Sequence, residues 1–221
     1  MPRHKFPDKN FEWTPRLAYA VGLLTTDGCL SSDGRHITMR SSETKMLQTF
    51  KQCLNLKNKI CKTRNGNIVS YRIQFGDVQF YRWLLTIGLF PAKTYTIGSI
   101  AVPDDYFIDF LRGHLDGDGS ITTYQDHYNT FKNPKYIYTR LFVRFISASR
   151  KHVEWLRDNI RRLIRVHGAI HKAKPHNPDK QVSMWILKFG KKESIVLLSQ
   201  LYYDHAIPCL RRKRNIAEQF I

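Results

Sequence analysis

The chain has 221 residues, which is enough for one large domain or for two small domains that share an interface. Hydrophobic residues make up 42% of it, which excludes a wholly disordered chain, and no apolar run reaches the ~18 residues of a membrane span. The formal net charge of +18 predicts a polyanionic partner, above all nucleic acid. Because residues 1–100 and 101–221 share this excess evenly, we expect each half to carry its own basic surface.

The cysteines and the N-terminus indicate the cellular compartment. Cys29, Cys53, Cys61 and Cys209 form no CxxC pair, so no zinc site is predicted and the thiols are expected to be reduced, as in an intracellular protein. The segment Met1–Pro15 lacks the apolar core of a signal peptide. We therefore expect a cytoplasmic or organelle-encoded protein with no targeting segment and no membrane association.

Residues 1–100 predict helices and strands in a regular order. The elements are an apolar helix that ends near Gly28, strands Cys29–Leu30 and His36–Arg40, a helix Glu43–Leu56, strands Lys59–Arg64 and Ile68–Phe75, and a helix Asp77–Leu89. Asp33-Gly34 and Asn65-Gly66 predict the two hairpin turns. Gly28, which follows the first helix, is expected to end it in the left-handed conformation.

Residues 101–221 repeat this order. The elements are an apolar helix that ends near Gly119, strands Ser120–Gln125 and Ile137–Ile146, a helix Arg150–Val166, strands Ala169–Lys174 and Gln181–Phe189, and a helix Lys191–Tyr203. The segment Asp126–Lys135 lengthens the first hairpin of this half. Each half is thus predicted to be α-β-β-α-β-β-α, which gives an α+β fold with a pseudo-twofold pair of four-stranded antiparallel sheets. We expect two domains, residues 1–100 and 101–221.

The ends of the two apolar helices share a short motif. The segments Ala20–Gly28 and Leu111–Gly119 each have a central glycine and then Asp-Gly, so Asp27 and Asp118 occupy matched positions. A carboxylate at a helix C-terminus is disfavoured by roughly 0.3–1 kcal/mol, and one such Asp-Gly is ordinary. Two copies in the same frame indicate a shared role for the two aspartates.

Close helix packing would bring the two aspartates together. Gly22 and Gly113 allow two helix backbones to approach closely, as small residues do at tight crossings. If the helices lie side by side and parallel, Asp27 and Asp118 meet at one edge and repel each other unless a cation is present. Carboxylate and carbonyl oxygens suit Mg²⁺, so the pattern predicts a divalent-metal site.

The paired segments resemble the LAGLIDADG motif of homing endonucleases, and their repetition resembles the two-motif, single-chain branch of that family. The second copy matches closely, whereas the first has Thr25 where the family usually has an acid. The resemblance covers nearly the whole chain. It implies a monomer in which the sheets form a DNA-binding saddle with the motif helices packed at the interface.

The resemblance also implies the metal site. Asp27 and Asp118 would bind two or three Mg²⁺ ions, with help from the main-chain carbonyls of Thr26 and Gly117. The ions would activate water and stabilise the leaving oxygen on each strand. Asp116, the additional acid of the second copy, is interpreted as structural or capping.

Basic residues are expected to assist cleavage, because the reaction adds negative charge to the phosphate. By resemblance, Lys45 and Lys151 open the second helix of each half near the metal pocket, preceded by the polar Ser41 and Ser147. The positions of the family's basic turn after the last helix are Lys93 and Lys213, and Arg211 or Arg212 remain alternatives to Lys213. Each of these basic residues is equally compatible with a solvated or phosphate-contacting role.

Outward-facing strand positions are the predicted DNA contacts, since a two-stranded ribbon fits the major groove. In the first half they are Arg35, Thr38, Arg40, Lys62, Arg64, Asn67, Arg72 and Gln74. In the second half they are Tyr124, Gln125, Arg140, Arg144, His171, Lys172, Lys174, Ser183, Trp185 and Lys188. Because the halves differ, the target should be asymmetric and on the order of two helical turns long, at ~10 bp each.

The predicted function is a site-specific, intron-encoded endonuclease that cuts double-stranded DNA with divalent metal. Two alternatives share the fold: a maturase that binds intron RNA, and a non-catalytic DNA-binding regulator. The presence of both aspartates favours the nuclease over either alternative. An intein nuclease would need splicing blocks that this sequence lacks.

Overall fold

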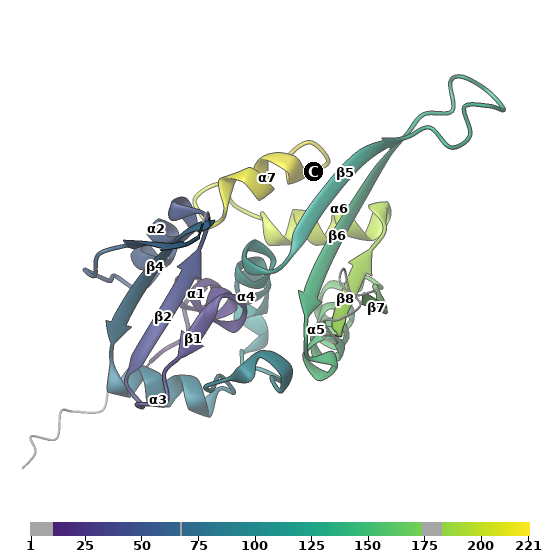
Figure 1. Ribbon diagram of the computed structural model, residues 1–221. Coiled ribbons are helices and arrows are strands. Elements are labelled where there is room, and N and C mark those ends of the chain that lie inside the picture. Colours follow the sequence, from purple (N-terminus) through teal and green to yellow (C-terminus); the bar gives the residue numbers. More distant parts are fainter. Residues whose placement is uncertain (1–10, 67, 174–182) are drawn as a thin grey trace, which may run out of the picture.

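Two four-stranded antiparallel sheets flank a central pair of helices in the computed structural model, which describes residues 11–66, 68–173 and 183–221 (Figure 1). The first part comprises α1 (Pro15–Thr26), β1 (Gly28–Leu30), β2 (His36–Ser41), α2 (Thr44–Cys53), β3 (Cys61–Asn65), β4 (Ile68–Gly76), α3 (Val78–Thr86) and the 3₁₀ helix η1 (Lys93–Tyr95). The second comprises α4 (Asp104–Gly117), β5 (Ser120–Asp126), β6 (Tyr138–Ser147), α5 (Arg150–Ile164), β7 (Ala169–Ala173), β8 (Met184–Phe189), α6 (Lys191–Leu201) and α7 (Arg211–Ala217). This α+β architecture confirms the predicted repeat.

The strand order is the same in both sheets. It is β1-β2-β4-β3 in the first and β5-β6-β8-β7 in the second, with every neighbouring pair antiparallel. Thr38 on β2 lies opposite Gln74 on β4, and the corresponding pair in the second sheet is Arg144 opposite Lys188. The internal repeat of the sequence is therefore a repeat of tertiary structure.

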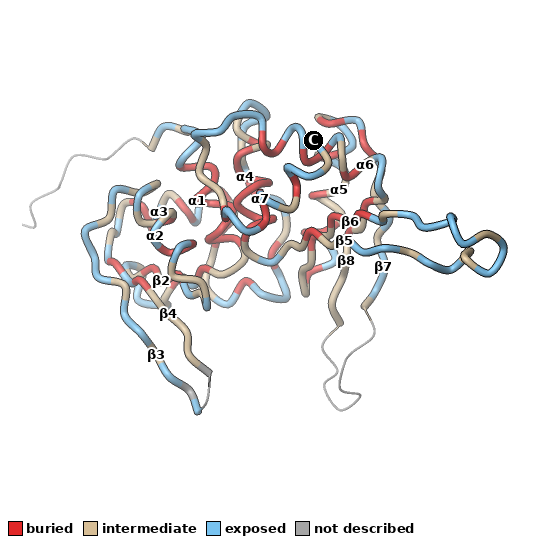
Figure 2. Tube along the Cα trace, turned by 90° about the horizontal axis from the view of Figure 1, so that it is seen from above, coloured by how far each residue is buried: buried red, intermediate tan, exposed pale blue. Residues whose placement is uncertain are grey.

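The central helices α1 and α4 begin with recognisable end signals. The Thr14 side chain accepts a hydrogen bond from the Leu17 backbone N–H at 3.1 Å, and Pro15 occupies the first turn of α1. Asp104 and Asp105 lie in the first turn of α4, where their negative charges interact favourably with the positive end of the helix dipole. Both helices are buried around most of their circumference, as expected of helices at the centre of a fold (Figure 2).

Buried and more exposed side chains alternate along the strands, so each sheet has one face covered by helices and one open face. Ile37, Met39 and Ile73 are buried in the first sheet, and Leu141 and Val143 are buried in the second. The matched helices α2 and α5 lie against these faces and bury further side chains at equivalent positions, Leu47 and Phe50 on α2 and Val153 and Leu156 on α5. One hydrophobic core thus extends through both halves.

Three features differ from the sequence-based predictions. Gly28 is not left-handed: a Cβ there would lie 2.5 Å from the Leu24 carbonyl oxygen, so glycine is required by a close approach of the chain to the last turn of α1. The basic segment around Lys213 is helical, as α7, and was not predicted as a helix. Strand β8 begins at Met184, whereas the predicted start, Gln181, lies outside the described residues.

Candidate metal centre and nucleic-acid interface

The two motif glycines set the distance between α1 and α4. A Cβ added to Gly22 would lie 2.1 Å from the Phe110 carbonyl oxygen, and one added to Gly113 would lie 2.1 Å from the Tyr19 carbonyl oxygen. Real Cβ atoms do not approach backbone so closely, so the helices contact each other through backbone atoms at these positions. The predicted tight crossing is confirmed.

This crossing brings the two motif aspartates to one edge of the molecule. Asp27 is the C-cap of α1 and Asp118 is the C-cap of α4. A Cβ added to Gly117 would lie 3.0 Å from Oδ2 of Asp27, so the backbone of the second motif touches the carboxylate of the first. The neighbouring cavity, of about 300 Å³, is lined by Asp27, Ser41, Glu43, Gly117, Arg212 and Lys213, among others.

The aspartates lie in an environment that penalises negative charge. Burial, followed by repulsion from Asp118, raises the pKa of Asp27 to about 7, although Lys213 and Lys93 act in the opposite direction. Burial likewise raises the pKa of Asp118, again opposed by both lysines. The site is therefore short of positive charge when both carboxylates are ionised.

Two buried lysines supply part of that positive charge. Nζ of Lys93 donates to the Gly28 carbonyl at 2.5 Å. Nζ of Lys213 donates to the carbonyls of Leu115 at 2.6 Å, Asp116 at 2.9 Å and Gly119 at 2.7 Å, which uses all three N–H bonds of the ammonium group. Both lysines thus lie at helix C-termini, where a cation is favourable, and burial lowers the pKa of each.

The geometry distinguishes Lys213 from its neighbours in the basic segment. Lys213 is 4% exposed, whereas Arg212 is exposed and pairs with Glu43 at 2.8 Å. Arg211 is also exposed and lines a separate cavity beside α2. Of the three candidates, Lys213 is the one that lies among the motif carbonyls, in a position matching that of Lys93.

The residues at this edge fit a divalent cation. Carboxylate and helix-end carbonyl oxygens are hard donors, and the repulsion between the two carboxylates is relieved by positive charge. In the described part of the chain no group of three or more His, Cys, Asp or Glu side chains forms a metal cluster, so the main-chain carbonyls of Thr26 and Gly117 would have to contribute. Gly117 allows the two motif ends to approach closely, because a Cβ there would lie 2.0 Å from Oγ1 of Thr26 and 3.0 Å from Oδ2 of Asp27.

These raised pKa values predict how stability depends on pH. The pKa of Asp27 is about 7 in the folded protein, against 3.8 for an unperturbed aspartate, so the unfolded chain releases this proton at lower pH. Without divalent cations, the free energy of unfolding should fall as the pH rises from about 4 to about 7, and Mg²⁺ should raise the Tm more at about pH 8 than at about pH 5. Thermal melts with EDTA and with Mg²⁺ measure both effects. Asp27→Asn should flatten the pH dependence, and an unchanged profile in that variant would contradict the assignment.

The lysines in the first turns of α2 and α5, unlike Lys93 and Lys213, are not buried. Lys45 and Lys151 are both exposed, and neither lines the cavity beside Asp27. Ser41 lines that cavity and its Oγ accepts from the Glu43 backbone N–H at 2.9 Å. Ser147 makes the matching bond with Ser149 at 3.1 Å, so both serines shape the turn before a helix. A catalytic role for Lys45 and Lys151 stays a prediction.

Nine of the predicted DNA contacts share the open faces of the two sheets. The cross-strand register and the alternation of burial place there Thr38, Arg40, Arg72, Gln74, Tyr124, Arg140, Arg144, His171 and Lys188. Arg144 and Lys188 also flank the ring of Phe142, at 5.6 and 3.8 Å from its centroid. Phe142 was not among the predicted DNA contacts, although the alternation along β6 places it on the same open face as Arg140 and Arg144.

The register corrects other predicted contacts. Lys62 pairs with Tyr71 and Lys172 with Trp185, so these residues, like Arg64 and Gln125, alternate to the opposite face. Trp185 packs against the core, under the guanidinium of Arg150 at 4.9 Å. Arg35 lies in the β1–β2 turn and Ser183 precedes β8, whereas Asn67 and Lys174 lie outside the described residues. The error arose because a shift of one residue in a strand reverses the face of every side chain.

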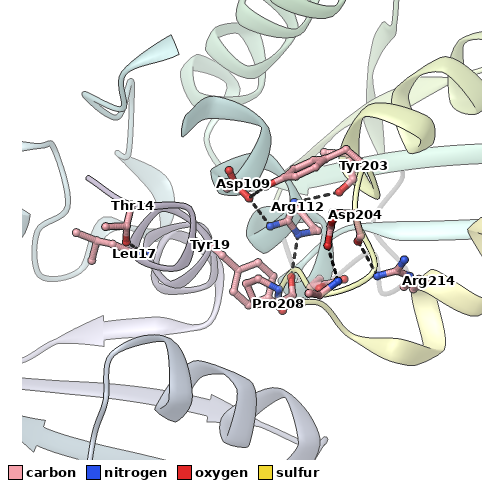
Figure 3. A network of polar contacts seen from close by, with 12 residues as sticks. Thr14, Leu17, Tyr19, Asp109, Arg112, Tyr203, Asp204, Pro208 and Arg214 are labelled. Atoms are coloured by element: carbon pink, nitrogen blue, oxygen red, sulfur yellow. Dashed lines mark hydrogen bonds and ion pairs between the residues drawn. The ribbon is translucent and has the colours of Figure 1, made fainter. Parts of the chain in front are cut away.

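A buried polar network behind the site was not predicted. Arg112 is fully buried on α4 and donates to the Pro208 carbonyl at 2.8 Å and the Leu201 carbonyl at 3.0 Å, while Asp109 accepts from Arg112 and from the Tyr203 hydroxyl (Figure 3). These bonds hold the segment between α6 and α7 against the central helices. Arg112 and Asp109 of α4 are thus hydrogen-bonded to residues about 90 positions further along the chain.

Asp116 belongs to the same arrangement. Its Oδ2 accepts from the Tyr19 hydroxyl at 2.8 Å and from the Leu210 backbone N–H at 2.6 Å. Burial raises its pKa, which Lys213 opposes. Asp116 therefore connects α1 and α4 with the segment that carries Lys213, which supports the structural role inferred for it.

Two antiparallel sheets related by an internal repeat, with a glycine-mediated crossing of two Asp-Gly helices between them, define the two-motif, single-chain LAGLIDADG fold. Solved structures share this fold. The homing endonuclease I-WcaI bound to its DNA recognition sequence has a TM-score of 0.59 at 10% identity, with 93% of this chain and 88% of that chain covered. I-DmoI in complex with DNA and Ca has a TM-score of 0.56 at 16% identity, with 92% and 97% covered.

The fold also occurs in a protein described as full-length DUF199/WhiA from Thermatoga maritima, with a TM-score of 0.54 at 13% identity. The comparison covers 95% of this chain, which spans 63% of that protein's chain. No family model and no curated protein matches the sequence. None of the helices in the described residues is long and apolar enough to cross a membrane. At these identities the likeness establishes the fold alone.

Proposed function

We propose that this chain is a site-specific endonuclease that cuts both strands of duplex DNA and depends on a divalent metal, with Mg²⁺ as the expected ion. The observation that carries the proposal is the meeting of Asp27 and Asp118 at adjacent helix ends beside two buried lysines. One carboxylate comes from each half, which suits one cut in each strand. DNA-bound homing endonucleases of the same fold support the choice of substrate.

Each residue of the site has a distinct part in this proposal. Asp27 and Asp118, with the carbonyls of Thr26 and Gly117, would hold the metal. When bound, divalent cations activate water and stabilise the leaving oxygen of a phosphodiester. Lys93 and Lys213 place positive charge beside the carboxylates, where it offsets the charge that develops on the phosphate.

The open faces of the two sheets would bind the duplex. Arginine, lysine, glutamine and threonine side chains on these faces suit contacts with phosphates and base edges. Each sheet lies within one of the proposed domains, residues 1–100 and 101–221, so a monomer would contact two different half-sites. We infer an asymmetric target on the order of two helical turns, at ~10 bp each.

A non-catalytic DNA-binding protein is the second candidate, because the basic open faces of the sheets suit duplex binding whether or not the aspartate pair holds a metal. Cleavage distinguishes the two. Tiled genomic DNA from the host would be incubated with the protein, with Mg²⁺ or with EDTA, and the new ends would be sequenced. The nuclease proposal predicts Mg²⁺-dependent ends at one or a few positions. Enrichment of the same fragments by pull-down without new ends would favour the non-catalytic candidate.

The two buried lysines should differ in their effects. Lys93→Met should slow single-turnover cleavage by about 10²-fold, the cost of removing one charge-stabilising group. Lys213→Met should slow it similarly and also lower the Tm, because three carbonyls lose their donor. Cleavage rates and thermal melts test this contrast.

Lys192→Met, at an exposed position on α6, is the matched control and should change neither quantity. Equal rates for Lys93→Met and the unmodified protein would exclude Lys93 from the reaction.

A further inference from the structure

The first hairpin of the second sheet carries an extension, residues 126–138, called here the aromatic arm. It continues β5 and β6 well beyond the rest of the sheet, and in Figure 2 it extends to the right, whereas β3 and β4 extend toward the bottom of the view (Figures 1 and 2). The corresponding hairpin of the first sheet closes at once, between Leu30 and His36. The repeated duplex-binding surface therefore does not require the arm.

The aromatic arm exposes an unusual amount of aromatic surface. Tyr128 is 80% exposed, Phe131 is 75% exposed, and Tyr136 and Tyr138 are 43% and 46% exposed. In the described part of the chain, four of the seven exposed aromatic side chains lie on this one hairpin. Apolar rings gathered in this way on a surface indicate a binding site.

The charge of the arm restricts the partner. His127, Lys132 and Lys135 are exposed, and Nζ of Lys132 lies 5.5 Å from the ring centroid of Phe131. The single acid of the arm, Asp126, is neutralised by an ion pair with Arg140 at 2.7 Å. The arm thus offers rings interleaved with uncompensated positive charge, which suits a polyanion with flat apolar groups.

We propose that the aromatic arm binds single-stranded RNA through its unpaired bases. Rings stack on base faces, and in a duplex those faces are occupied by the neighbouring base pairs, whereas RNA loops and bulges leave them free. The lysines would contact the phosphates between the stacked bases. The arm projects from one end of the second open face, where its Asp126 and Tyr138 adjoin Arg140, and its outer rings Tyr128 and Phe131 lie beyond that face. Stacking on these outer rings does not involve the aspartate pair, so it does not depend on the proposed nuclease activity.

Removal of the rings tests the proposal. In the full chain, the Tyr128→Ala/Phe131→Ala variant would be compared with Tyr128→Phe/Phe131→Tyr, which keeps both rings. Fluorescence anisotropy would measure the Kd for an RNA hairpin with an unpaired loop, for the same stem without a loop, for a single-stranded DNA of the loop sequence, and for duplex DNA. Since each stacked base contributes about 1–3 kcal/mol, the ring-less variant should bind loop RNA about tenfold or more weakly.

The matched variant that keeps the rings should bind loop RNA like the unmodified protein, and both variants should keep its Tm and its duplex-DNA affinity. If the ring-less variant lost duplex-DNA affinity as strongly as loop-RNA affinity, the proposal would be overturned, and the arm would instead be a contact to the outer part of a DNA duplex. Tighter binding to single-stranded DNA than to loop RNA, no loss at all, or ring-dependent binding to vesicles of anionic lipid instead of RNA would also overturn it. Every binding measurement would be made in the Asp118→Asn background, which is expected not to cut DNA. A failure of RNA binding can then be told apart from a failure of the nuclease proposal, which concerns cleavage alone.

Discussion

Replacing Asp118 with asparagine is expected to abolish double-strand cleavage while duplex binding is retained. Asparagine keeps the shape of the side chain but not the negative charge that a hard divalent cation requires. The loss should be on the order of 10³-fold or more in the single-turnover rate, and Asp27→Asn should behave in the same way. Cleavage of a supercoiled plasmid that carries the identified target measures the rate, and gel shift in Ca²⁺ measures binding.

The asparagine variants should also be as stable as the parent protein or more so. Burial raises the pKa of both aspartates, and repulsion from Asp118 raises that of Asp27 further, so removing one charge relieves a penalty. Asp158→Asn, at an exposed position on α5, is the matched control and should cut normally. If Asp27→Asn and Asp118→Asn both cut the two strands at the parental rate, the assignment of the metal site is wrong.

Gly113→Ala is expected to destabilise the protein severely. The added Cβ would lie 2.1 Å from the Tyr19 carbonyl oxygen, and backbone at the centre of a packed interface cannot move aside cheaply. We expect a loss of more than about 3 kcal/mol, which corresponds to a fall in Tm of roughly 10 °C for a chain of this size. Thermal and urea melts in EDTA measure it without any contribution from metal binding.

Gly98→Ala provides the matched control for this effect. A Cβ at Gly98 meets no atom within 4 Å, and its φ is not positive, so the substitution should change the stability by less than about 0.5 kcal/mol. If the two variants melt together, the close approach of α1 and α4 does not hold in solution.

The sequence by itself determined the repeated order of helices and strands and the pairing of the two aspartates. These properties are local or periodic: Leu47 and Phe50 recur at helical spacing, and Leu141, Val143 and Phe145 recur at every second position. Gly22 and Gly113 predicted the helix crossing, because only a close contact explains glycine in the middle of an apolar helix. Because Asp27 and Asp118 follow these glycines at the same spacing, the crossing of the helices also determines that the two aspartates lie close together.

Tertiary structure alone decided which side chains share a face and which charges meet. Lys62 and Trp185 face away from the open surface because register depends on partner strands, which a single segment does not specify. Lys213 was chosen over Arg211 and Arg212 by the path of the segment between α6 and α7, which Arg112 and Asp116 hold in place. These contacts join residues more than 90 positions apart, and no local pattern encodes such a pairing.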